Sequence, residues 1–389
     1  MPPMVVDAAT SVPDWRRGPP ASLSTYNGRM TTKPRVLVAM SGGVDSAVAA
    51  ALLHEQGYDV VGVTLRLYTE ADDTAYRSKR SCCGVEDVAD ARAAAQRIGI
   101  PHYVLNMERE FERDVLGPFV QAYADGRTPN PCLACNQHVK FSTLLERALA
   151  MGCDLLATGH YARIDRLEGR YRLLTAVDER KDQSYVLYTL DQEALRRTVF
   201  PVGELAKSEV RRIAASIGLG VADKPDSADI CFVPGGDYRE LLRSRGVAFE
   251  AGTIVTADGT EIGRHEGAAG YTVGQRRGIG AAGGERRYVT AVDARANLVV
   301  AGTEDELMAH SLAVSDPHWV SGPPREDEAL TARIRYHGAL VDARVRERSE
   351  SGFVIGFARP VRAAAPGQAA VLYRGAEVVG GGTIEGRRS

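Results

Sequence analysis

The sequence predicts an α/β protein that begins with a parallel sheet covered by helices on both faces, continues with a small central domain and ends in a β-barrel. From residue 35 onward, short runs rich in β-branched residues alternate with stretches of helical periodicity, which is typical of a parallel sheet. After about residue 233, glycine becomes frequent and helical periodicity ends. From about residue 311, apolar and polar residues alternate in short runs separated by turn signals, which favours a small barrel or sandwich.

The elements of the first unit follow from these patterns in order. We expect a buried strand over residues 35–40 and further strands over residues 59–65, 102–107 and 154–160. We expect helices over residues 46–56, 86–99, 136–152 and 205–220. Residues 161–177 alternate on either side of a turn at residues 167–169, so they predict a β-hairpin.

Shifts in composition divide the chain into four segments. Residues 1–33 are rich in Pro, Ser, Thr and Gly, and we expect them to form a disordered leader. The strand–helix unit is assigned to residues 34–235, the central domain to residues 236–308 and the barrel to residues 309–389. No internal repeat is evident in the sequence.

Composition restricts the class of protein. Of the 389 residues, 44% are hydrophobic and 25% are charged, as in an ordinary globular protein. A net charge of -2 argues against a uniformly basic nucleic-acid surface, although local basic patches are compatible with it. The leader has no apolar core of signal-peptide length, and no segment approaches the roughly 18 apolar residues of a transmembrane helix. We therefore expect a cytoplasmic protein without a membrane span.

The hexapeptide Ser-Gly-Gly-Val-Asp-Ser lies where a phosphate-binding loop belongs, between a strand and a helix. Gly42 and Gly43 let the backbone approach an anion closely, and the helix that follows offers free N–H groups. Ser41 and Ser46 can add hydroxyl donors, and Asp45 can hold Mg²⁺ or orient the loop. A glycine pair alone is equally compatible with an ordinary turn. The hexapeptide lacks the lysine of an ordinary P-loop.

The cysteines give a second chemical signal. Cys132 and Cys135 form a C-x-x-C pair just before a helix expected to begin near Asn136, and Cys231 lies at the end of the strand–helix unit. A thiol near a helix N-terminus is expected to have a lowered pKa. By itself the pair is compatible with redox chemistry, half of a zinc site that His138 could extend, or chance. The cysteines expected to have no catalytic role are Cys82, Cys83 and Cys153.

The complete hexapeptide resembles the SGGxDS signature of the PP-loop ATP pyrophosphatases. That resemblance implies that ATP is split between its α- and β-phosphates and that a substrate oxygen is adenylated. A nucleophile then displaces AMP. The missing lysine fits this chemistry, because pyrophosphate leaves and the γ-phosphate is not the transferred group. The signature does not name the substrate.

Longer motifs carry a closer resemblance. In order they are PNPCLACNQHVKF, ATGHYAR, KDQSYVLY, FPVGELAKSEVR, KPDSADICFVPGGDY and GYTVGQRRGIG. Together they resemble the tRNA-specific 2-thiouridylases, the MnmA family, over essentially everything from Lys33 onward. The resemblance implies an adenine nucleotide alpha hydrolase-like fold and thiolation of the wobble uridine, at ring position 2, in tRNAs for Lys, Glu and Gln.

The same resemblance implies roles for individual residues. Cys231 would carry a persulfide, and Cys135 would be the partner thiol that releases sulfide or joins Cys231 in a transient disulfide. ATP, with Mg²⁺, would be bound by Ala39, Met40, Ser41, Gly42, Gly43, Val44, Asp45, Ser46, Leu65 and Gly159. Target base and tRNA would be contacted by Asn130, Pro131, Cys132, His160, Lys181, Asp182, Gln183, Arg335, Tyr336 and Gln368.

The sequence departs from the better-known branch of the family at Cys132, where that branch has an aspartate proposed to act as acid or base. The departure puts that proton-transfer role in doubt. Three cysteines, Cys132, Cys135 and Cys231, are also the ligand number of a [4Fe–4S] cluster with one open iron. We place the persulfide route first and the cluster second, because the sequence cannot show whether the three thiols converge.

Two further interpretations concern partners and rival functions. Arg276 and Arg277, with Arg286 and Arg287, form local basic clusters that favour a surface for the RNA backbone, with ordinary solvated charge as the alternative. The sulfur donor would be a cysteine desulfurase or a sulfur-relay protein. The rival functions are another PP-loop ligase, acting on a small carboxylic acid, and a non-catalytic iron–sulfur or RNA-binding protein.

Overall fold

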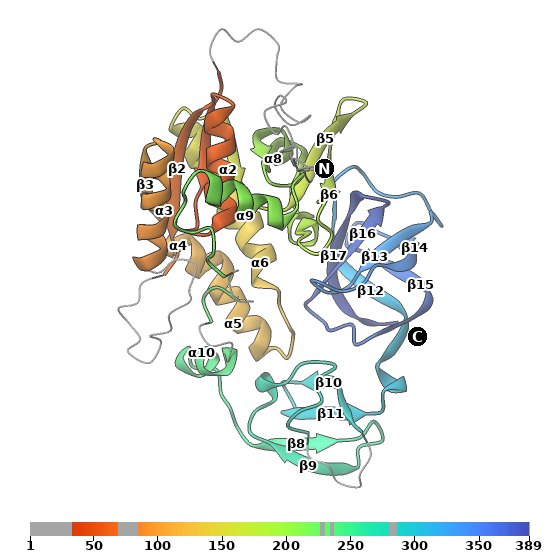
Figure 1. Cartoon of the computed structure of the whole chain (residues 1–389). Helices are drawn as coiled ribbons and strands as arrows, with labels where there is room; N and C mark the ends of the chain where they lie inside the picture. The colour runs from red at the N-terminus through yellow and green to blue at the C-terminus, as the bar shows by residue number, and fades with distance from the viewer. Residues whose placement is uncertain (1–32, 69–84, 226–229, 234–236, 280–285, 389) are drawn as a thin grey trace, which may run out of the picture.

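The computed structural model describes residues 33–68, 85–225, 230–233, 237–279 and 286–388. Three sheets lie in these residues, and Figure 1 shows them as three adjacent parts of the molecule. The expectations for the leader and for the Cys82–Cys83 pair fall outside the described residues. No helix in the described ranges is long and apolar enough to cross a membrane.

The first sheet is parallel and has the strand order β3-β2-β1-β4-β7, which confirms the predicted α/β unit. Its strands are β1 (Arg35–Ala39), β2 (Asp59–Arg66), β3 (His102–Asn106), β4 (Leu155–Thr158) and β7 (Thr198–Val199). The helices that follow these strands are α2 (Val44–Glu55), α3 (Val85–Ile98), α4 (Glu108–Phe111), η2 (Glu112–Leu116), α5 (Gly117–Ala124), α8 (Gln192–Arg197) and α9 (Lys207–Ser216).

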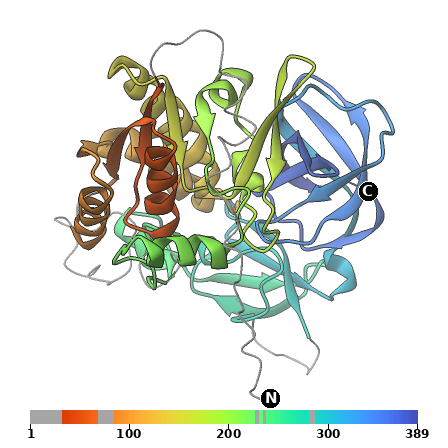
Figure 2. The same ribbon diagram turned by 45° about the horizontal axis from the view of Figure 1, so that its top comes forward.

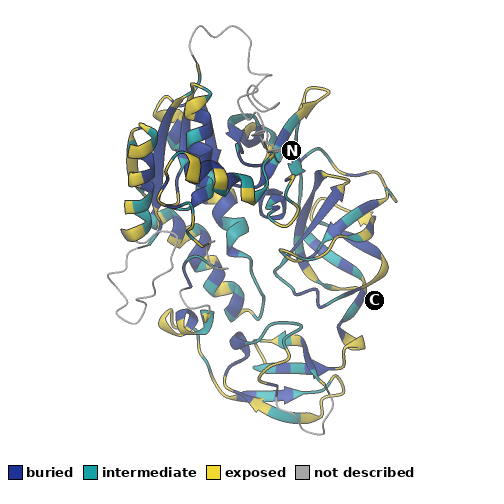
Figure 3. Ribbon diagram, in the orientation of Figure 1, coloured by how far each residue is buried: buried dark blue, intermediate teal, exposed yellow. Residues whose placement is uncertain are grey.

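Alternation along β1 explains why this central strand of the sheet is buried on both faces. Val36 and Val38 point into a core formed with α2, α3 and α9. Leu37 points to the opposite face, into a core that contains Phe119 of α5 and Val139. Successive side chains of a strand point to opposite faces, so an uninterrupted apolar run is required. Figure 3 shows the buried strands between helices whose outer faces are exposed.

The helix predicted over residues 136–152 begins earlier, at Pro131. It consists of α6 (Pro131–Ala134), a π-helical stretch η3 (Cys135–Leu144) and α7 (Leu145–Ala150). Asn130 caps it, because its side chain accepts a hydrogen bond from the Cys132 amide, and proline occupies the first helical position. Cys132 therefore lies in the first turn rather than before the helix, and the expected start near Asn136 was wrong.

The small central domain follows α10 (Tyr238–Ser244) and contains a four-stranded sheet in the order β10-β11-β8-β9. Its strands are β8 (Gly252–Val255), β9 (Glu261–His265), β10 (Tyr288–Asp293) and β11 (Leu298–Gly302), with a short helix η6 (Ala268–Gly270). The sheet has a hydrophobic core of its own, which includes Ile254 and Val299, as expected for a separate domain.

The C-terminal part is a closed barrel, as predicted, because its first and last strands, β12 and β17, pair with each other. Its elements are η7 (Asp305–Leu307), β12 (Met308–Trp319), β13 (Leu330–Arg333), β14 (Val341–Arg348), β15 (Gly352–Arg362), β16 (Ala369–Arg374) and β17 (Glu377–Arg387).

The predicted hairpin is present as β5 (Ala162–Leu167) and β6 (Arg170–Thr175), and η4 (Ser184–Leu187) follows it. It pairs with the barrel and not with the parallel sheet. Glu377 of β17 lies opposite Leu174 of β6, and the Thr175 amide donates to the Ala376 carbonyl at 2.8 Å. Figure 2 shows the hairpin beside the barrel, so one sheet crosses from the first unit into the last.

Candidate active site

A cavity of about 380 Å³ opens at the carboxyl ends of β1, β2 and β4, the edge where an open α/β sheet binds its ligands. The predicted site residues that line it are Ala39, Met40, Ser41, Asp45, Ser46, Leu65, Pro131, Cys132, Cys135, Gly159, His160, Gln183, Cys231 and Tyr336. Both chemical signals of the sequence, the phosphate loop and the three cysteines, therefore meet in one cavity.

The phosphate-binding loop is held in shape by its own serines. The Ser46 hydroxyl accepts from the Ser41 amide at 3.1 Å and donates to the Gly43 carbonyl at 3.2 Å. Gly42 has a φ of 74°, and a β-carbon there would lie 2.4 Å from the Asp87 carbonyl oxygen. Because a side chain at this position would be both strained and crowded, the loop requires this glycine.

Asp45 is bound by two partners from distant parts of the chain. Lys207 places its Nζ 2.7 Å from both carboxylate oxygens, and the Tyr161 hydroxyl donates to one of them at 2.7 Å. The Asp45 side chain is 31% exposed and that of Lys207 12% exposed, so this ion pair is mostly shielded from solvent.

A second lysine contacts the loop through a backbone carbonyl. Lys224 donates to the Gly42 carbonyl at 3.1 Å and forms ion pairs with Asp87 and Asp90 of α3 at 2.7 and 2.5 Å. These bonds hold Lys224 itself beside the phosphate loop.

The end of β4 closes against the loop. Gly159 approaches so closely that a β-carbon would lie 2.6 Å from the Ser46 amide nitrogen. The next residue, His160, is buried, and its Nδ1 is 2.7 Å from the Thr158 hydroxyl. Burial, together with the nearby Lys140 cation, lowers the pKa of His160 well below its ordinary value, so the imidazole is neutral at neutral pH.

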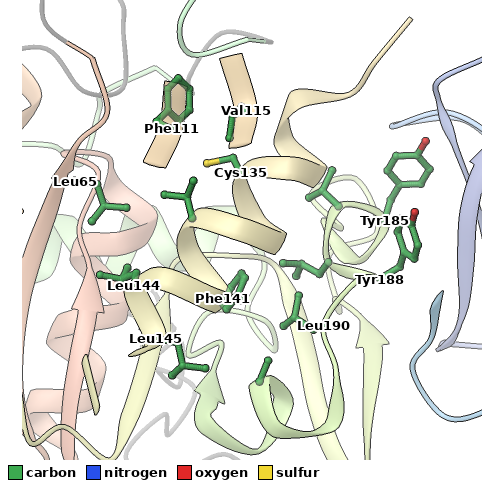
Figure 4. Packing of buried hydrophobic residues seen from close by; sticks show 14 of the residues in the cluster. Leu65, Phe111, Val115, Cys135, Phe141, Leu144, Leu145, Tyr185, Tyr188 and Leu190 are labelled. Carbon is green, nitrogen blue, oxygen red and sulfur yellow. The ribbon is translucent and has the colours of Figure 1, made fainter. Parts of the chain in front are cut away.

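The part of the cavity lined by Cys132, Cys135 and Cys231 is called the sulfur end here. Its surroundings are apolar at Cys135. Cys135 is 7% exposed and packs in a core cluster with Phe111 and Phe232, and Figure 4 shows it beside Phe111. Burial raises the pKa of the Cys135 thiol, although the Lys140 cation opposes the rise. The lowered pKa expected for a thiol near a helix N-terminus was therefore wrong for Cys135, because desolvation outweighs the helix end.

The structure separates the residues expected at the RNA into two groups. Pro131, His160, Gln183 and Tyr336 line the cavity. Those outside its lining are Asn130, Lys181, Asp182, Arg335 and Gln368.

Two residues of the second group hold the barrel against the first unit. Asp182 is 3% exposed; its carboxylate accepts from the Ala176 and Ser184 amides and forms an ion pair with Arg333 at 2.8 Å. Gln368 donates to the Thr128 carbonyl at 2.9 Å, just before the helix that carries Cys132. Both side chains are therefore placed to position the site.

Sequence reasoning missed Lys140, Tyr161 and Lys207. Lys140 lines the cavity beside Cys135, and its ammonium donates to the Asn136 side chain at 3.0 Å. All three residues lie inside motifs that carried the family resemblance, ATGHYAR, FPVGELAKSEVR and PNPCLACNQHVKF. A search of those motifs for unassigned cations would have found both lysines, whereas their partners depend on the fold.

In the described ranges of the chain, no three His, Cys, Asp or Glu side chains are grouped so as to hold a metal ion. The arrangement of the three thiols thus does not match a cluster site. Asp45 and the hydroxyls of Ser41 and Ser46, by contrast, are the oxygen donors that suit Mg²⁺ beside a bound triphosphate.

Protein-family models match all three parts of the chain. A model described as the tRNA methyl transferase HUP domain matches residues 34–235, the corresponding PRC-barrel domain matches residues 242–303, and an aminomethyltransferase beta-barrel domain matches residues 309–384. Among solved structures, a 4-thiouridine synthetase–RNA complex with bound ATP aligns at 15% identity over 55% of this chain and 50% of that one, with a TM-score of 0.34. That likeness is too low to add to the assignment.

Curated relatives match nearly end to end. The tRNA-specific 2-thiouridylase MnmA of Roseiflexus sp. is 49% identical over 90% of this chain and 99% of its own length. The enzyme of the same name from Chloroflexus aurantiacus is 49% identical over 90% of this chain and 98% of its own, and that from Geobacter metallireducens is 46% identical over 91% and 97%. With its phosphate loop and three cysteines around one cavity, this chain belongs to the MnmA family of tRNA-specific 2-thiouridylases.

Proposed function

We propose that this protein is an ATP-dependent tRNA sulfurtransferase that makes 2-thiouridine at the wobble position of tRNAs for Lys, Glu and Gln. The observation that carries the proposal is the cavity itself, whose lining includes both the phosphate-binding loop, its phosphate end, and Cys132, Cys135 and Cys231, its sulfur end. A reaction that couples ATP cleavage to sulfur transfer needs both in one place.

The first half of the reaction uses the phosphate end. The uridine O2 attacks the α-phosphorus of ATP, the bond to the β-phosphate breaks, and pyrophosphate leaves. The loop amides and the N-terminus of α2 hold the phosphates, and Asp45, Ser41 and Ser46 would hold Mg²⁺. Bound Mg²⁺ would supply neutralisation of phosphate charge. The adenylated oxygen is then a good leaving group.

The second half uses the sulfur end. Cys231 would carry the incoming sulfur as a persulfide. The Cys135 thiolate attacks Sγ of Cys231, a Cys135–Cys231 disulfide forms, and hydrosulfide leaves. Hydrosulfide adds to C2 of the uridine and AMP departs, so that the oxygen is replaced by sulfur. A dithiol reductant must then reduce the disulfide before another turnover.

The base reaches this cavity only after leaving the anticodon stack, as for other enzymes that act on a nucleobase. Tyr336, which lines the cavity from the barrel side, offers an aromatic surface for the extruded base. Arg276 and Arg277 of the central domain are exposed, as a backbone-contacting surface requires. We propose that the barrel and the central domain, assigned to residues 309–389 and 236–308, hold the RNA while residues 34–235 perform the chemistry.

The thiols decide between two tRNA modifications suggested by the comparisons. The family models carry the words methyl transferase, whereas the curated relatives are named 2-thiouridylases. Methyl transfer has no use for three thiols around an ATP-binding loop, and neither does a ligase that amidates a small acid. Sulfur transfer uses two of them directly, Cys231 as the persulfide carrier and Cys135 as the attacking thiolate. The sulfur donor would be a cysteine desulfurase or a relay protein, and a tRNA substrate fits a cytoplasmic location.

The test is mass analysis of the anticodon-loop uridine after reaction with wild-type protein and with Cys231→Ser. Wild type is expected to produce 2-thiouridine and to release pyrophosphate only when tRNA is present, whereas Cys231→Ser is expected to produce none. Cys153→Ser is the matched control, since Cys153 is a buried cysteine that does not line the cavity. Thiolation at the normal rate by Cys231→Ser would overturn the assignment, as would pyrophosphate release that depends on a small acid.

Anaerobically purified protein distinguishes the persulfide route from the cluster route. A colourless, iron-free and fully active protein supports the persulfide. Activity that requires stoichiometric iron and labile sulfide would contradict it.

A further inference from the structure

The reaction proposed above gives tasks to two of the three thiols and leaves Cys132 without one. Cys132 and Cys135 lie three positions apart in the helix that begins at Pro131, with Cys132 in its first turn. Residues at this spacing lie on the same face of a helix, and both side chains line the cavity. Spacing and position are those of a C-x-x-C pair that forms and breaks a disulfide.

The three thiols differ in their exposure to solvent. Cys135 is 7% exposed and belongs to the aromatic core cluster, whereas Cys132 and Cys231 are half-buried and pack against that cluster. The backbone of Cys231 is held there, because its carbonyl accepts a hydrogen bond from the Tyr68 hydroxyl at 3.2 Å. A disulfide between Cys135 and Cys231 would therefore have one sulfur that is shielded from a reductant in solution.

We propose that Cys132 is the thiol that resolves the disulfide formed during sulfur release. The Cys132 thiolate attacks Sγ of Cys135 and forms a Cys132–Cys135 disulfide, while the bond from Cys135 to Cys231 breaks. Cys231 leaves as a thiolate and takes up the proton that Cys132 gave up, so the exchange involves no net oxidation or reduction. The inference rests on the proposed function, because the disulfide that is resolved forms in that reaction.

This exchange returns the sulfur carrier to use. Cys231 is again a thiol and can accept the next sulfur, while the oxidised pair is Cys132–Cys135. A dithiol reductant then attacks Sγ of Cys132 and supplies two electrons and two protons to that pair, as the proposed function already requires of a dithiol. The half-buried position of Cys132 leaves this sulfur within reach of solvent.

The surroundings of the thiols favour this direction of exchange. Thiol–disulfide exchange needs access to the attacked sulfur and a leaving thiolate that is stabilised. Cys132 lies in the same cavity one helical turn from Cys135, so it can reach a sulfur that is shielded from solution. The positive end of the helix dipole favours the attacking thiolate. The departing thiolate of Cys231 is only half-buried and keeps contact with water.

Two other tasks for Cys132 lead to different expectations. In the branch of the family that has an aspartate at this position, the residue is proposed to transfer protons. A carboxylate can transfer a proton but cannot exchange a disulfide, so Cys132→Asp separates the two tasks. A cluster ligand would need all three thiols grouped around iron, and the described residues contain no such group.

Disulfide mapping after turnover tests the proposal directly. Wild type and Cys132→Ser are loaded with sulfur by polysulfide, desalted, and allowed to react with ATP and tRNA without a dithiol. Quenching with N-ethylmaleimide and mass analysis of the peptides identify the disulfide. We expect Cys132–Cys135 and an alkylated Cys231 in wild type, and Cys135–Cys231 in Cys132→Ser. Wild type that thiolates tRNA yet contains only Cys135–Cys231 would overturn the proposal.

Steady-state thiolation gives a second measurement, with a cysteine desulfurase and cysteine as the sulfur source and a limiting concentration of dithiothreitol. Cys132→Ser and Cys132→Asp should turn over roughly tenfold more slowly or worse, because attack from solution replaces an intramolecular step. A higher concentration of dithiothreitol should restore part of the rate in both. Turnover of Cys132→Asp at the wild-type rate would assign proton transfer to this position and would overturn the proposal.

Cys153→Ser is the matched control, because Cys153 is a buried cysteine outside the cavity lining, and it should keep the wild-type rate and disulfide. Thermal unfolding identifies a misfolded variant, and the mapping of wild type tests the proposal without any variant. Absence of 2-thiouridine from the wild-type reaction would contradict the proposed function. Normal 2-thiouridine with only the Cys135–Cys231 disulfide would contradict this inference alone.

Discussion

The phosphate end and the sulfur end of the cavity are built in different ways. The phosphate end comes from the first unit alone, because the loop and its partners Tyr161 and Lys207 all lie within residues 34–235. The sulfur end depends on the barrel as well. The Thr128 amide donates to the Pro366 carbonyl at 2.8 Å, and Gln368 donates back to the Thr128 carbonyl at 2.9 Å. The segment that enters the Cys132 helix is therefore held by the domain proposed to hold RNA.

The two ends also differ in polarity. At the phosphate end, carboxylate, ammonium and hydroxyl groups are already hydrogen-bonded or ion-paired to one another. This polar arrangement suits the binding of a charged triphosphate. At the sulfur end, aromatic side chains surround Cys135 and its thiol stays protonated at neutral pH. We therefore expect ATP to bind without tRNA, and we expect sulfur release to depend on the contacts that the barrel and the substrate add around Cys135.

The largest expected effects come from one substitution at each end of the cavity, which should separate pyrophosphate release from thiolation. Asp45→Ala removes a loop carboxylate and should reduce tRNA-dependent pyrophosphate release by about a thousandfold, since it disturbs both Mg²⁺ and Lys207. Cys135→Ser should abolish thiolation to a similar extent while pyrophosphate is still released. Parallel assays of pyrophosphate and 2-thiouridine measure both. Loss of pyrophosphate release in Cys135→Ser would contradict the division.

A substitution in the barrel should affect only the sulfur end. Gln368→Ala removes the donor to Thr128, so we expect thiolation to fall roughly tenfold while ATP affinity stays unchanged. The control is Arg388→Ala, which breaks an exposed ion pair with Glu347 elsewhere on the barrel. Equal effects of the two substitutions on thiolation would show that the Gln368 contact has no special role.

The rate at which Cys135 is alkylated should depend on pH in a way that reflects its apolar surroundings. Because burial raises its pKa, the thiolate fraction at neutral pH is small and increases with pH. Alkylation of Cys135 should therefore accelerate about tenfold per pH unit through pH 8 and beyond. Lys140→Met should slow it further, since the Lys140 cation lowers this pKa. Mass mapping of the labelled peptides gives the rate, and a plateau below pH 8 would contradict the expectation.

The smallest effect concerns stability. The pKa of His160 is depressed by burial, so the unfolded state binds a proton more readily than the folded state as the pH falls below about 6.5. The neutral imidazole therefore contributes fully to the free energy of unfolding above that pH. Below it the contribution is lost, and the free energy of unfolding falls by at most about 1.4 kcal/mol per pH unit. Denaturant unfolding between pH 5 and 7 measures the slope. His160→Gln should have a shallower one.

Local patterns were sufficient for most of the fold and for the position of the hexapeptide loop between a strand and a helix. The apolar run of β1, the alternation of the barrel strands and the hexapeptide loop are encoded by neighbouring residues, so their prediction held. The partners of those residues are not encoded locally. The contact of Lys207 with Asp45 crosses 162 positions, and that of Gln368 with Thr128 crosses 240. Desolvation of Cys135 also arises from residues remote in sequence, which is why the sign of its pKa shift was missed.

The hairpin β5–β6 joins two parts of the molecule that are far apart in the sequence. Because β6 pairs with β17, the first unit and the barrel share a sheet although the central domain separates them in sequence. The central domain is thus an insertion between two halves of one structural body. A nascent chain therefore completes that body only after its last strand, β17, has been synthesised.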